Sequence, residues 1–394
     1  MFKVRTKLKN IIIALGIAAA LSLTSMPQIS AAVDNDEILS VQDITFLRSS
    51  KKKIQISWNK MPSEHIKSFI VKKKSFVNDI NSDAEWEEVK ILDASEYDSG
   101  EKIKVIDELA DKSYQRYLYR VDTEYDETLQ NIQTEGKEIP ASNILVCIDP
   151  GHYKGRNAVE GQNSYGYVEG DFVLKIAKLL KQDLKQNYGI DVYMTRTKGD
   201  IELGGYKNML LDNGHISLRG EYASKRNSDL FVSLHTNANQ ANANGYETNS
   251  QPLKINKAMI IVNKISYNSS KILEMCNEIG DRLTQVNYEL GISKSNIFKR
   301  VENGTVKKWT SKYNDGLNKT GTVVYRWSNG NDYYGVLRGA ANAGIPGIII
   351  EHGMHTIPKL REIARDGKLA ERWAEADAEG IASAFGVNTV YAKD

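Results

Sequence analysis

Four residues that could coordinate a metal or transfer protons stand at the ends of apolar or helical segments. His152 closes "ILVCIDPGH", His235 closes "DLFVSLH" and Glu351 closes "PGIIIE", whereas Glu169 opens "EGDFVLKIAKLLKQDLKQN". Imidazole and carboxylate groups bind metals and exchange protons under ordinary conditions. The four residues are far apart in the chain, so only the fold can bring them together.

The sequence from Asn143 onward predicts strands that alternate with helices. Residues 169–187 carry an apolar side chain every four positions, which indicates a helix with one buried face. Further helices are expected at "LRGEYASKRN", "NSSKILEMCNEIGDRLTQVNYEL" and "LAERWAEADAEGIASAF", and further strands at "IDVYMTR" and "GIPGIIIEHG". The alternation predicts an α/β domain with a mainly parallel sheet flanked by helices.

In such a sheet the carboxyl ends of the strands share one edge, where sites form. We therefore expect His152, His235 and Glu351 to meet at this edge, together with Glu169 at the start of a helix. Pro150 and Gly151 would end the first strand sharply, so that His152 points into the site.

Two histidines and one carboxylate are typical of hydrolytic zinc sites, which keep the fourth position for water. His152, Glu169 and His235 are the predicted ligands of one Zn²⁺ per chain. With a single carboxylate ligand, the ion could polarise a carbonyl and lower the pKa of bound water. A second carboxylate would then take a proton from that water and give it to a leaving amine. Glu351, at the end of an apolar strand, is the candidate for this catalytic role.

Other roles are open for each of these residues. A histidine at a turn needs no ligand, and Glu169 alone could be a carboxylate favoured by the dipole at a helix start. Asp149 and Asp171 are acidic neighbours, and Asp149 could hold the turn or orient a ligand. Glu351 could be a carboxylate at a strand end, although burying it unpaired after "GIII" would be costly.

Residues beyond the strand ends are weaker candidates for substrate contacts. Asn237 and Glu247 follow His235 and could line a cleft. The segment "YRWSNGNDYYG" is aromatic and polar, which suits sugar or peptide contact and equally an ordinary loop. Arg219 is expected to pair with a carboxylate of the fold.

The first 32 residues predict a secretory signal peptide. Four basic residues precede the apolar segment "IIIALGIAAALSL", and small residues end at Ala32. Removing these residues takes away four positive charges and no negative ones, so the formal net charge of +2 becomes −2. We expect a protein that is secreted to the cell wall or cell surface, with no membrane span after cleavage. A nearly neutral mature chain gives no indication of nucleic acid binding.

Residues 36–126 predict an all-β sandwich domain in front of the α/β domain. In "KIQISWNK" and "YLYRVDT", apolar or aromatic residues alternate with mainly polar ones, as in half-buried antiparallel strands. The early tryptophan and the tyrosine-rich late strand resemble a fibronectin type III domain, which has about this length. The polar segment 127–141 is expected to be a linker, and 142–390 the α/β domain. Cys147 and Cys276 are expected to be isolated small apolar residues, because they fall in unrelated elements.

Four blocks of sequence carry a more specific resemblance. They are "IDPGH", "VEGDF", "LRGEYASKRNSDLFVSLHTNAN" and "GVLRGAANAGIPGIIIEHG", in this order. With them, the chain from Asn143 to about Val387 resembles the zinc-dependent N-acetylmuramoyl-L-alanine amidases of the family 3 type. Two features depart from the family. Extra residues lie between Gln240 and Asp332, and "HGMHT" follows Glu351, so the roles of its two histidines are open.

The resemblance implies that His152, Glu169 and His235 bind zinc and that Glu351 is the catalytic glutamate. It implies that the substrate is peptidoglycan, cleaved at the amide between N-acetylmuramic acid and L-alanine of the stem peptide. Two competing hypotheses are a non-catalytic cell-wall-binding or adhesion protein with an amidase fold, and a zinc peptidase that cuts within the stem peptide.

Overall fold

A computed structural model describes residues 38–75, 84–161, 163–238, 257–308 and 321–387. The predicted signal peptide and Glu247 lie outside these residues, so both stay predictions. The described residues all belong to one compact unit.

The central sheet of the α/β region is mixed, and most of its strand pairs are parallel. Only β14 and β20 pair in antiparallel fashion, which confirms a mainly parallel sheet among the described strands. β14 falls within the expected insertion and was not predicted. The strands, in spatial order, are β10 (Asp191–Met194), β9 (Leu145–Pro150), β13 (Leu230–Asn237), β20 (Gly347–Met354), β14 (Met259–Val262), β17 (Gly321–Tyr325) and β15 (Phe298–Lys299), and β16 (Lys307–Lys308) also pairs with β17.

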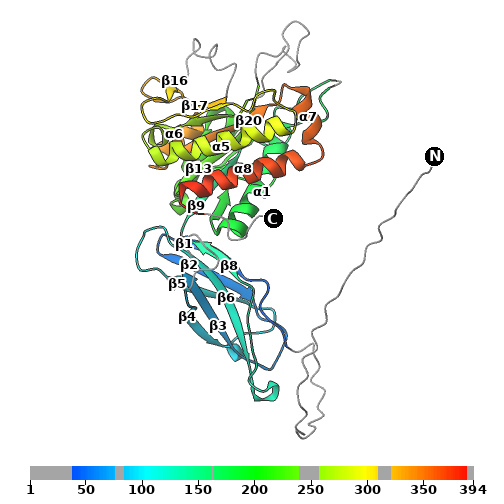
Figure 1. Cartoon of the computed structure of the whole chain (residues 1–394), viewed down its shortest axis with the longest axis vertical. Coiled ribbons are helices and arrows are strands. Elements are labelled where there is room, and N and C mark those ends of the chain that lie inside the picture. The colour runs from blue at the N-terminus through cyan, green and yellow to red at the C-terminus, as the bar shows by residue number, and fades with distance from the viewer. Residues whose placement is uncertain (1–37, 76–83, 162, 239–256, 309–320, 388–394) are drawn as a thin grey trace, which may run out of the picture. The chain divides into compact units, whose positions relative to one another are not determined.

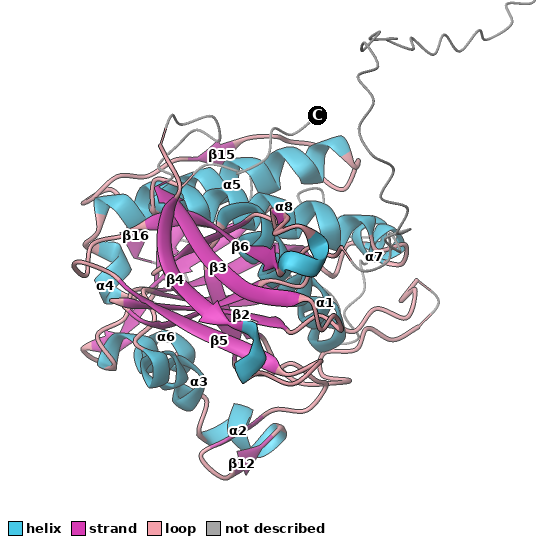
Figure 2. Ribbon diagram, turned by 90° about the horizontal axis from the view of Figure 1, so that it is seen from below, coloured by secondary structure: helices cyan, strands magenta, loops and turns pink. Residues whose placement is uncertain are grey.

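Helices pack against both faces of this sheet. α1 (Glu169–Tyr188), α5 (Ser270–Glu289) and α8 (Lys368–Ala384) cover one face, where α5 and α8 run side by side (Figure 1). α3 (Ser217–Glu221) and α6 (Gly335–Asn342) pack together on the other face (Figure 2). None of the helices in the described part of the chain combines the length and apolar character needed to cross a bilayer. The shorter helices are α2 (Met209–Gly214), α4 (Lys264–Tyr267) and α7 (Pro358–Ala364).

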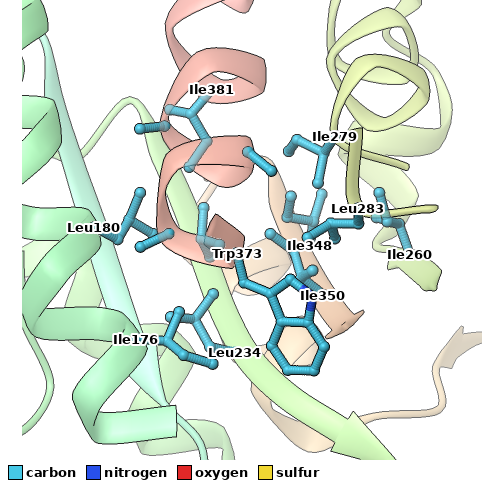
Figure 3. Packing of buried hydrophobic residues seen from close by; sticks show 14 of the residues in the cluster. Ile176, Leu180, Leu234, Ile260, Ile279, Leu283, Ile348, Ile350, Trp373 and Ile381 are labelled. Carbon is cyan, nitrogen blue, oxygen red and sulfur yellow. The ribbon is translucent and has the colours of Figure 1, made fainter. Parts of the chain in front are cut away.

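The main core lies between the sheet and the layer formed by α1, α5 and α8 (Figure 3). Each fully buried Leu or Ile side chain in it stabilises the fold by about 1.5–3 kcal/mol. This packing holds β13 and β20 in a parallel register that places His235 opposite Glu351. The labelled core residues in Figure 3 are Ile176, Leu180, Leu234, Ile260, Ile279, Leu283, Ile348, Ile350, Trp373 and Ile381.

Two antiparallel sheets precede the α/β region. They share an apolar core in which the Trp58 and Phe69 rings meet edge to face at 5.6 Å. The resemblance to a fibronectin type III domain stays a prediction. The first sheet contains β1 (Thr45–Ser50), β2 (Lys53–Asn59) and β5 (Lys102–Glu108); the second contains β4 (Glu87–Asp93), β3 (Ile66–Ser75), β6 (Arg116–Tyr125), β7 (Gln133–Thr134) and β8 (Ile139–Ser142).

The segment expected to be a linker, 127–141, takes part in the second sheet. β7 and β8 both pair with β6, so these residues are not a free connection in the structure. The exact division into domains therefore stays a prediction.

A buried arginine joins the β-rich residues to the α/β region. Arg48 is 1% exposed. Its backbone N–H donates to Asp191 Oδ2 at 2.9 Å, its Nη1 donates to the Arg226 carbonyl at 2.6 Å and its Nε donates to the Asn143 carbonyl at 3.2 Å. A buried guanidinium needs such partners to offset its lost hydration, so these contacts specify how β1 packs on β10.

Candidate active site

The end of β9 brings two imidazoles close together. After Pro150, the Gly151 N–H donates to the Leu234 carbonyl at 3.0 Å, and His152 adopts a left-handed backbone with φ of 59°. A Cβ on residue 151 would lie 2.2 Å from Cε1 of His235, so only glycine leaves room for that ring. The His152 and His235 rings are therefore 4.8 Å apart, nearly perpendicular at 87°.

The first residue of α1 places a buried carboxylate between these rings. Glu169 is 2% exposed. Its Oε2 lies 3.4 Å from His152 Nε2, and its Oε1 lies 3.1 Å from His235 Nδ1. Burial alone would raise the pKa of Glu169, but the two histidines hold it well below its usual value. The two imidazoles thus favour the ionised form of Glu169 at the centre of the site.

Two further donors fix the orientation of the Glu169 carboxylate. The Thr236 N–H donates to Oε1 at 3.0 Å, and the Asn157 side-chain amide donates to Oε2 at 2.8 Å. Each oxygen thus has one structural donor and one imidazole neighbour, which leaves the side between the two rings for a cation.

The spacing of the three side chains fits a zinc ion. Their potential ligand atoms all lie within 4.8 Å of one another. Two ligands about 2.0–2.1 Å from a tetrahedral zinc are about 3.3 Å apart. His152 lies 3.4 Å from one oxygen of Glu169, and His235 lies 3.1 Å from the other oxygen. The donor types agree as well, since imidazole and carboxylate are ordinary zinc ligands.

Two charged residues, Asp212 and Arg219, contact His152 on the side of its Nδ1 and its backbone carbonyl. Its Nδ1 lies 3.5 Å from Asp212 Oδ2, and Arg219 donates to Asp212 Oδ1 at 2.8 Å and to the His152 carbonyl at 2.6 Å. Arg219 is 1% exposed and also donates to Asp149 Oδ1 at 2.9 Å. Burial works against a charged His152 ring, but Asp212 and Glu169 raise its pKa to about 9. The His152 ring thus lies between two carboxylates, with Glu169 at its Nε2 and Asp212 at its Nδ1.

Glu351 lies beside this cluster on the neighbouring strand. Glu351 pairs directly with His235 in the register of β20 and β13. Its Oε2 is buried without a hydrogen-bond partner among the described residues. Burial, followed by the negative charge of Glu169, raises the pKa of Glu351 to about 8. A carboxyl group with such a pKa can both accept and donate a proton in general acid–base catalysis.

The two histidines after Glu351 are placed outside the cluster of three. His352 is fully buried; its Nδ1 lies 2.9 Å from the His235 carbonyl and its Nε2 lies 2.8 Å from Asp377 Oδ2. The Nδ1 of His355 lies 3.0 Å from the Thr236 carbonyl. The two rings thus tie the end of β20 and the residue that follows it to the end of β13, which carries His235.

The structure brings together His152, Glu169, His235 and Glu351, as expected from their strand ends. Asn237 is half-buried at the end of β13, where its carbonyl accepts a hydrogen bond from the His355 N–H at 2.9 Å. Part of the predicted contact segment forms the small hairpin of β18 (Trp327–Ser328) and β19 (Asn331–Asp332).

Sequence reasoning missed three residues that hold the cluster. Asn157 and Thr236 contact Glu169, and Asp212 lies behind His152. Thr236 adjoins His235 and could have been noted as a neighbour. Asn157 and Asp212 lie in loop-like segments without periodicity, so no pattern in the sequence singles them out.

Comparisons with known proteins agree on one family. The family model described as N-acetylmuramoyl-L-alanine amidase matches residues 146–383, which is more than half of the chain. The N-acetylmuramoyl-L-alanine amidase AmiA of Escherichia coli (strain K12) is 25% identical over 250 residues, which cover 61% of this chain and 76% of AmiA. AmiC of Escherichia coli O6:H1 is 33% identical over 95 residues, 24% of this chain and 19% of AmiC.

Solved structures of such amidases are also similar. The catalytic domain of CwlV from Bacillus (Paenibacillus) polymyxa var. colistinus matches with a TM-score of 0.40 and 18% identity, over 62% of this chain and 99% of that domain. An N-acetylmuramoyl-L-alanine amidase from Clostridium difficile 630 matches with a TM-score of 0.38 and 22% identity, over 61% of this chain and 95% of the other.

Proposed function

Since the chain belongs to the N-acetylmuramoyl-L-alanine amidase family, we propose that it is a zinc-dependent hydrolase acting on peptidoglycan. Its substrate bond is the amide between the lactyl group of N-acetylmuramic acid and L-alanine of the stem peptide. One observation carries this proposal: His152, Glu169 and His235 converge at zinc-ligand spacing beside Glu351.

In the proposed mechanism, His152, Glu169 and His235 would hold one zinc ion. When bound, this ion would supply Lewis-acid chemistry to the substrate carbonyl and to the attacking water. Glu351 accepts a proton from the water as its oxygen attacks the carbonyl carbon. The C–N bond then breaks, and Glu351 gives the proton to the departing nitrogen of L-alanine. The products are a free lactyl carboxylic acid and a stem peptide with a free amino group.

The decisive experiment digests purified peptidoglycan and identifies the products by mass spectrometry, with and without a metal chelator. We expect stem peptides that begin with a free L-alanine amino group, and no release in the presence of the chelator until zinc is restored. Cleavage within the stem would indicate a peptidase instead, and wall binding without hydrolysis after zinc addition would indicate a non-catalytic binding protein.

The role of Glu351 is tested by the variant Glu351→Gln. We expect its turnover to fall about 10²–10⁴-fold, because the amide can neither accept nor return the proton. The exposed Glu371→Gln on α8 is the matched control and should keep full activity. Full activity of Glu351→Gln on purified muropeptides would rule out this mechanism.

We also propose that the protein is exported to the cell wall or cell surface. The support is the basic and apolar character of residues 1–32, together with the wall substrate of the family. N-terminal sequencing of the extracellular protein should begin just after Ala32; a mature protein that keeps residues 1–32 would contradict cleavage.

A further inference from the structure

A second concave surface lies along the carboxyl-terminal half of α1. It has a volume of about 680 Å³ and is lined by α1 residues from Lys178 to Asn187 and, on its other side, by residues that include Phe46 and Lys137. At 1.5 Å per helical residue, the lysines on α1 lie about 14–24 Å from Glu169. The groove is therefore separate from the candidate active site.

The groove is strongly positive. Four lysines line it, Lys137, Lys178, Lys181 and Lys185, and none of the lining residues is acidic. Lys185 forms an ion pair with Asp191 at 3.0 Å and donates to the Phe46 carbonyl. The described residues offer no hydrogen bond or ion pair to the other three ammonium groups. Partial burial and the neighbouring charge of Lys185 lower the pKa of Lys181, and the negative charge of Asp191 offsets this lowering only in part.

The positive charge is local to this groove. The formal net charge of the chain without residues 1–32 is −2, so the positive charge around this cavity is not shared by the chain as a whole. Buried Ile44 and Phe46 form an apolar part of the wall. A low-dielectric wall beside charges of one sign strengthens their field and attracts oppositely charged ligands.

The spacing and type of the cations indicate the chemistry of the ligand. Lys178, Lys181 and Lys185 follow one another at three and four residues, so they form a row with rises of about 4.5 and 6 Å along the helix. A row of charges suits an extended polymer with repeated anionic groups. Lysine is a common point-charge ligand of phosphate groups, and the four cations that line the groove are all lysines.

We propose that this groove is an accessory binding site for a linear phosphate-bearing polyanion. When such a polymer is attached to the cell wall, its binding keeps the enzyme beside its substrate. That biological consequence rests on the proposed function, whereas binding of the polyanion does not.

The test measures binding of labelled inorganic polyphosphate to the purified chain by fluorescence anisotropy at several salt concentrations. With three to four phosphate contacts, the logarithm of the association constant should fall with the logarithm of salt with a slope of about −2 to −3. The variant Lys178→Glu/Lys181→Glu, which keeps the Lys185–Asp191 pair, should bind at least about 10-fold more weakly at low salt and show a shallower slope.

The matched control is Lys294→Glu/Lys299→Glu, which changes the charge equally at exposed positions away from the groove. It should stay within about twofold of the parent. An equal loss in both variants, or no binding by the parent, would overturn the proposal. Polyglutamate that competes as well as polyphosphate would overturn the assignment of phosphate.

A second arm separates this proposal from the proposed function. Binding to wall sacculi should drop when their phosphodiester polymers are removed chemically, and the parent should lose more binding than the Lys178→Glu/Lys181→Glu variant. Both proteins should hydrolyse soluble muropeptides equally well. If neither protein hydrolyses muropeptides while polyphosphate still binds to the parent, the enzymatic proposal fails and the groove proposal stands. If the parent binds equally well to sacculi without their phosphodiester polymers, the wall polymer is not the source of the phosphate groups.

Discussion

The imidazole of His152 has a carboxylate on each side. Glu169 faces its Nε2, and Asp212 faces its Nδ1 at 3.5 Å, with Arg219 holding the Asp212 carboxylate in place. Carboxylates behind a metal-binding imidazole fix its tautomer and raise its basicity. We therefore propose that Asp212 is a positioning residue for His152 in the proposed zinc site.

Replacing Asp212 with Asn should weaken zinc binding about 10–100-fold, because the amide cannot hold a proton on Nδ1 as a carboxylate does. The measurement is competition for zinc with a chromophoric chelator at fixed pH. Asp200→Asn is the control, since Asp200 is exposed and pairs only with Asn208 and Lys207 among the described residues. An unchanged zinc affinity of Asp212→Asn would show that Asp212 does not support His152.

At the residue scale, the sequence predicted side chains whose positions follow from a strand or helix end. His152, His235 and Glu351 come directly after apolar runs, and Glu169 begins a periodic segment, so topology alone brings them to one edge. Asp212 could not be predicted in the same way. It lies on the short helix α2, whose approach to His152 depends on how a loop folds over the sheet edge.

The sharp turn after β9 is the element that sets the distance between the two imidazoles. Gly151 has an ordinary backbone conformation, so the steric requirement comes from His235, whose ring occupies the space where a Cβ would be. The turn is also fixed by the hydrogen bond from the Gly151 N–H to β13. A side chain at this position must therefore displace the ring or the turn.

The variant Gly151→Ala should lose at least about 10-fold in zinc affinity and in kcat/KM, because the His235 ring has to move away. The added methyl group should also lower the free energy of unfolding by about 1–3 kcal/mol, as overpacking usually does. Zinc titration and urea unfolding measure the two effects. Gly214→Ala, where a Cβ meets nothing within 4 Å, should change neither; wild-type zinc affinity in Gly151→Ala would contradict the steric argument.

At the element scale, long periodic segments were predicted well and short or irregular ones were not. The expected helix at 169–187 is α1, and "GIPGIIIEHG" contains β20. β14 has only four residues and its antiparallel pairing with β20 is not encoded in its own sequence. β7 and β8 have only two and four residues, too few to show a periodic pattern, although Ala141 of β8 is part of the apolar core.

For the molecule as a whole, the contact between the β-rich residues and the α/β region depends on buried charge. The Arg48 guanidinium donates to the Asn143 and Arg226 carbonyls and lies 4.0 Å from the buried Asp229, with which Lys51 forms an ion pair at 3.1 Å. This contact could not be predicted from the sequence, because no local pattern distinguishes Arg48 from the many exposed charged residues of the chain. Buried charges specify one arrangement because any other leaves them unpaired.

Replacing Arg48 with Ala should lower the free energy of unfolding by about 3–5 kcal/mol, because the buried Asp229, 4.0 Å from the Arg48 guanidinium, loses a charged partner and the carbonyls of Asn143 and Arg226 lose their donors. Urea unfolding, followed by both tryptophan fluorescence and far-UV circular dichroism, measures this change. If the contact couples the two regions, the single transition of the parent should separate into two in the variant. Lys53→Ala removes the exposed ion pair with Glu108 and should leave the free energy of unfolding nearly unchanged. A variant Arg48→Ala as stable as Lys53→Ala would mean that the β-rich residues are held to the α/β region by other contacts.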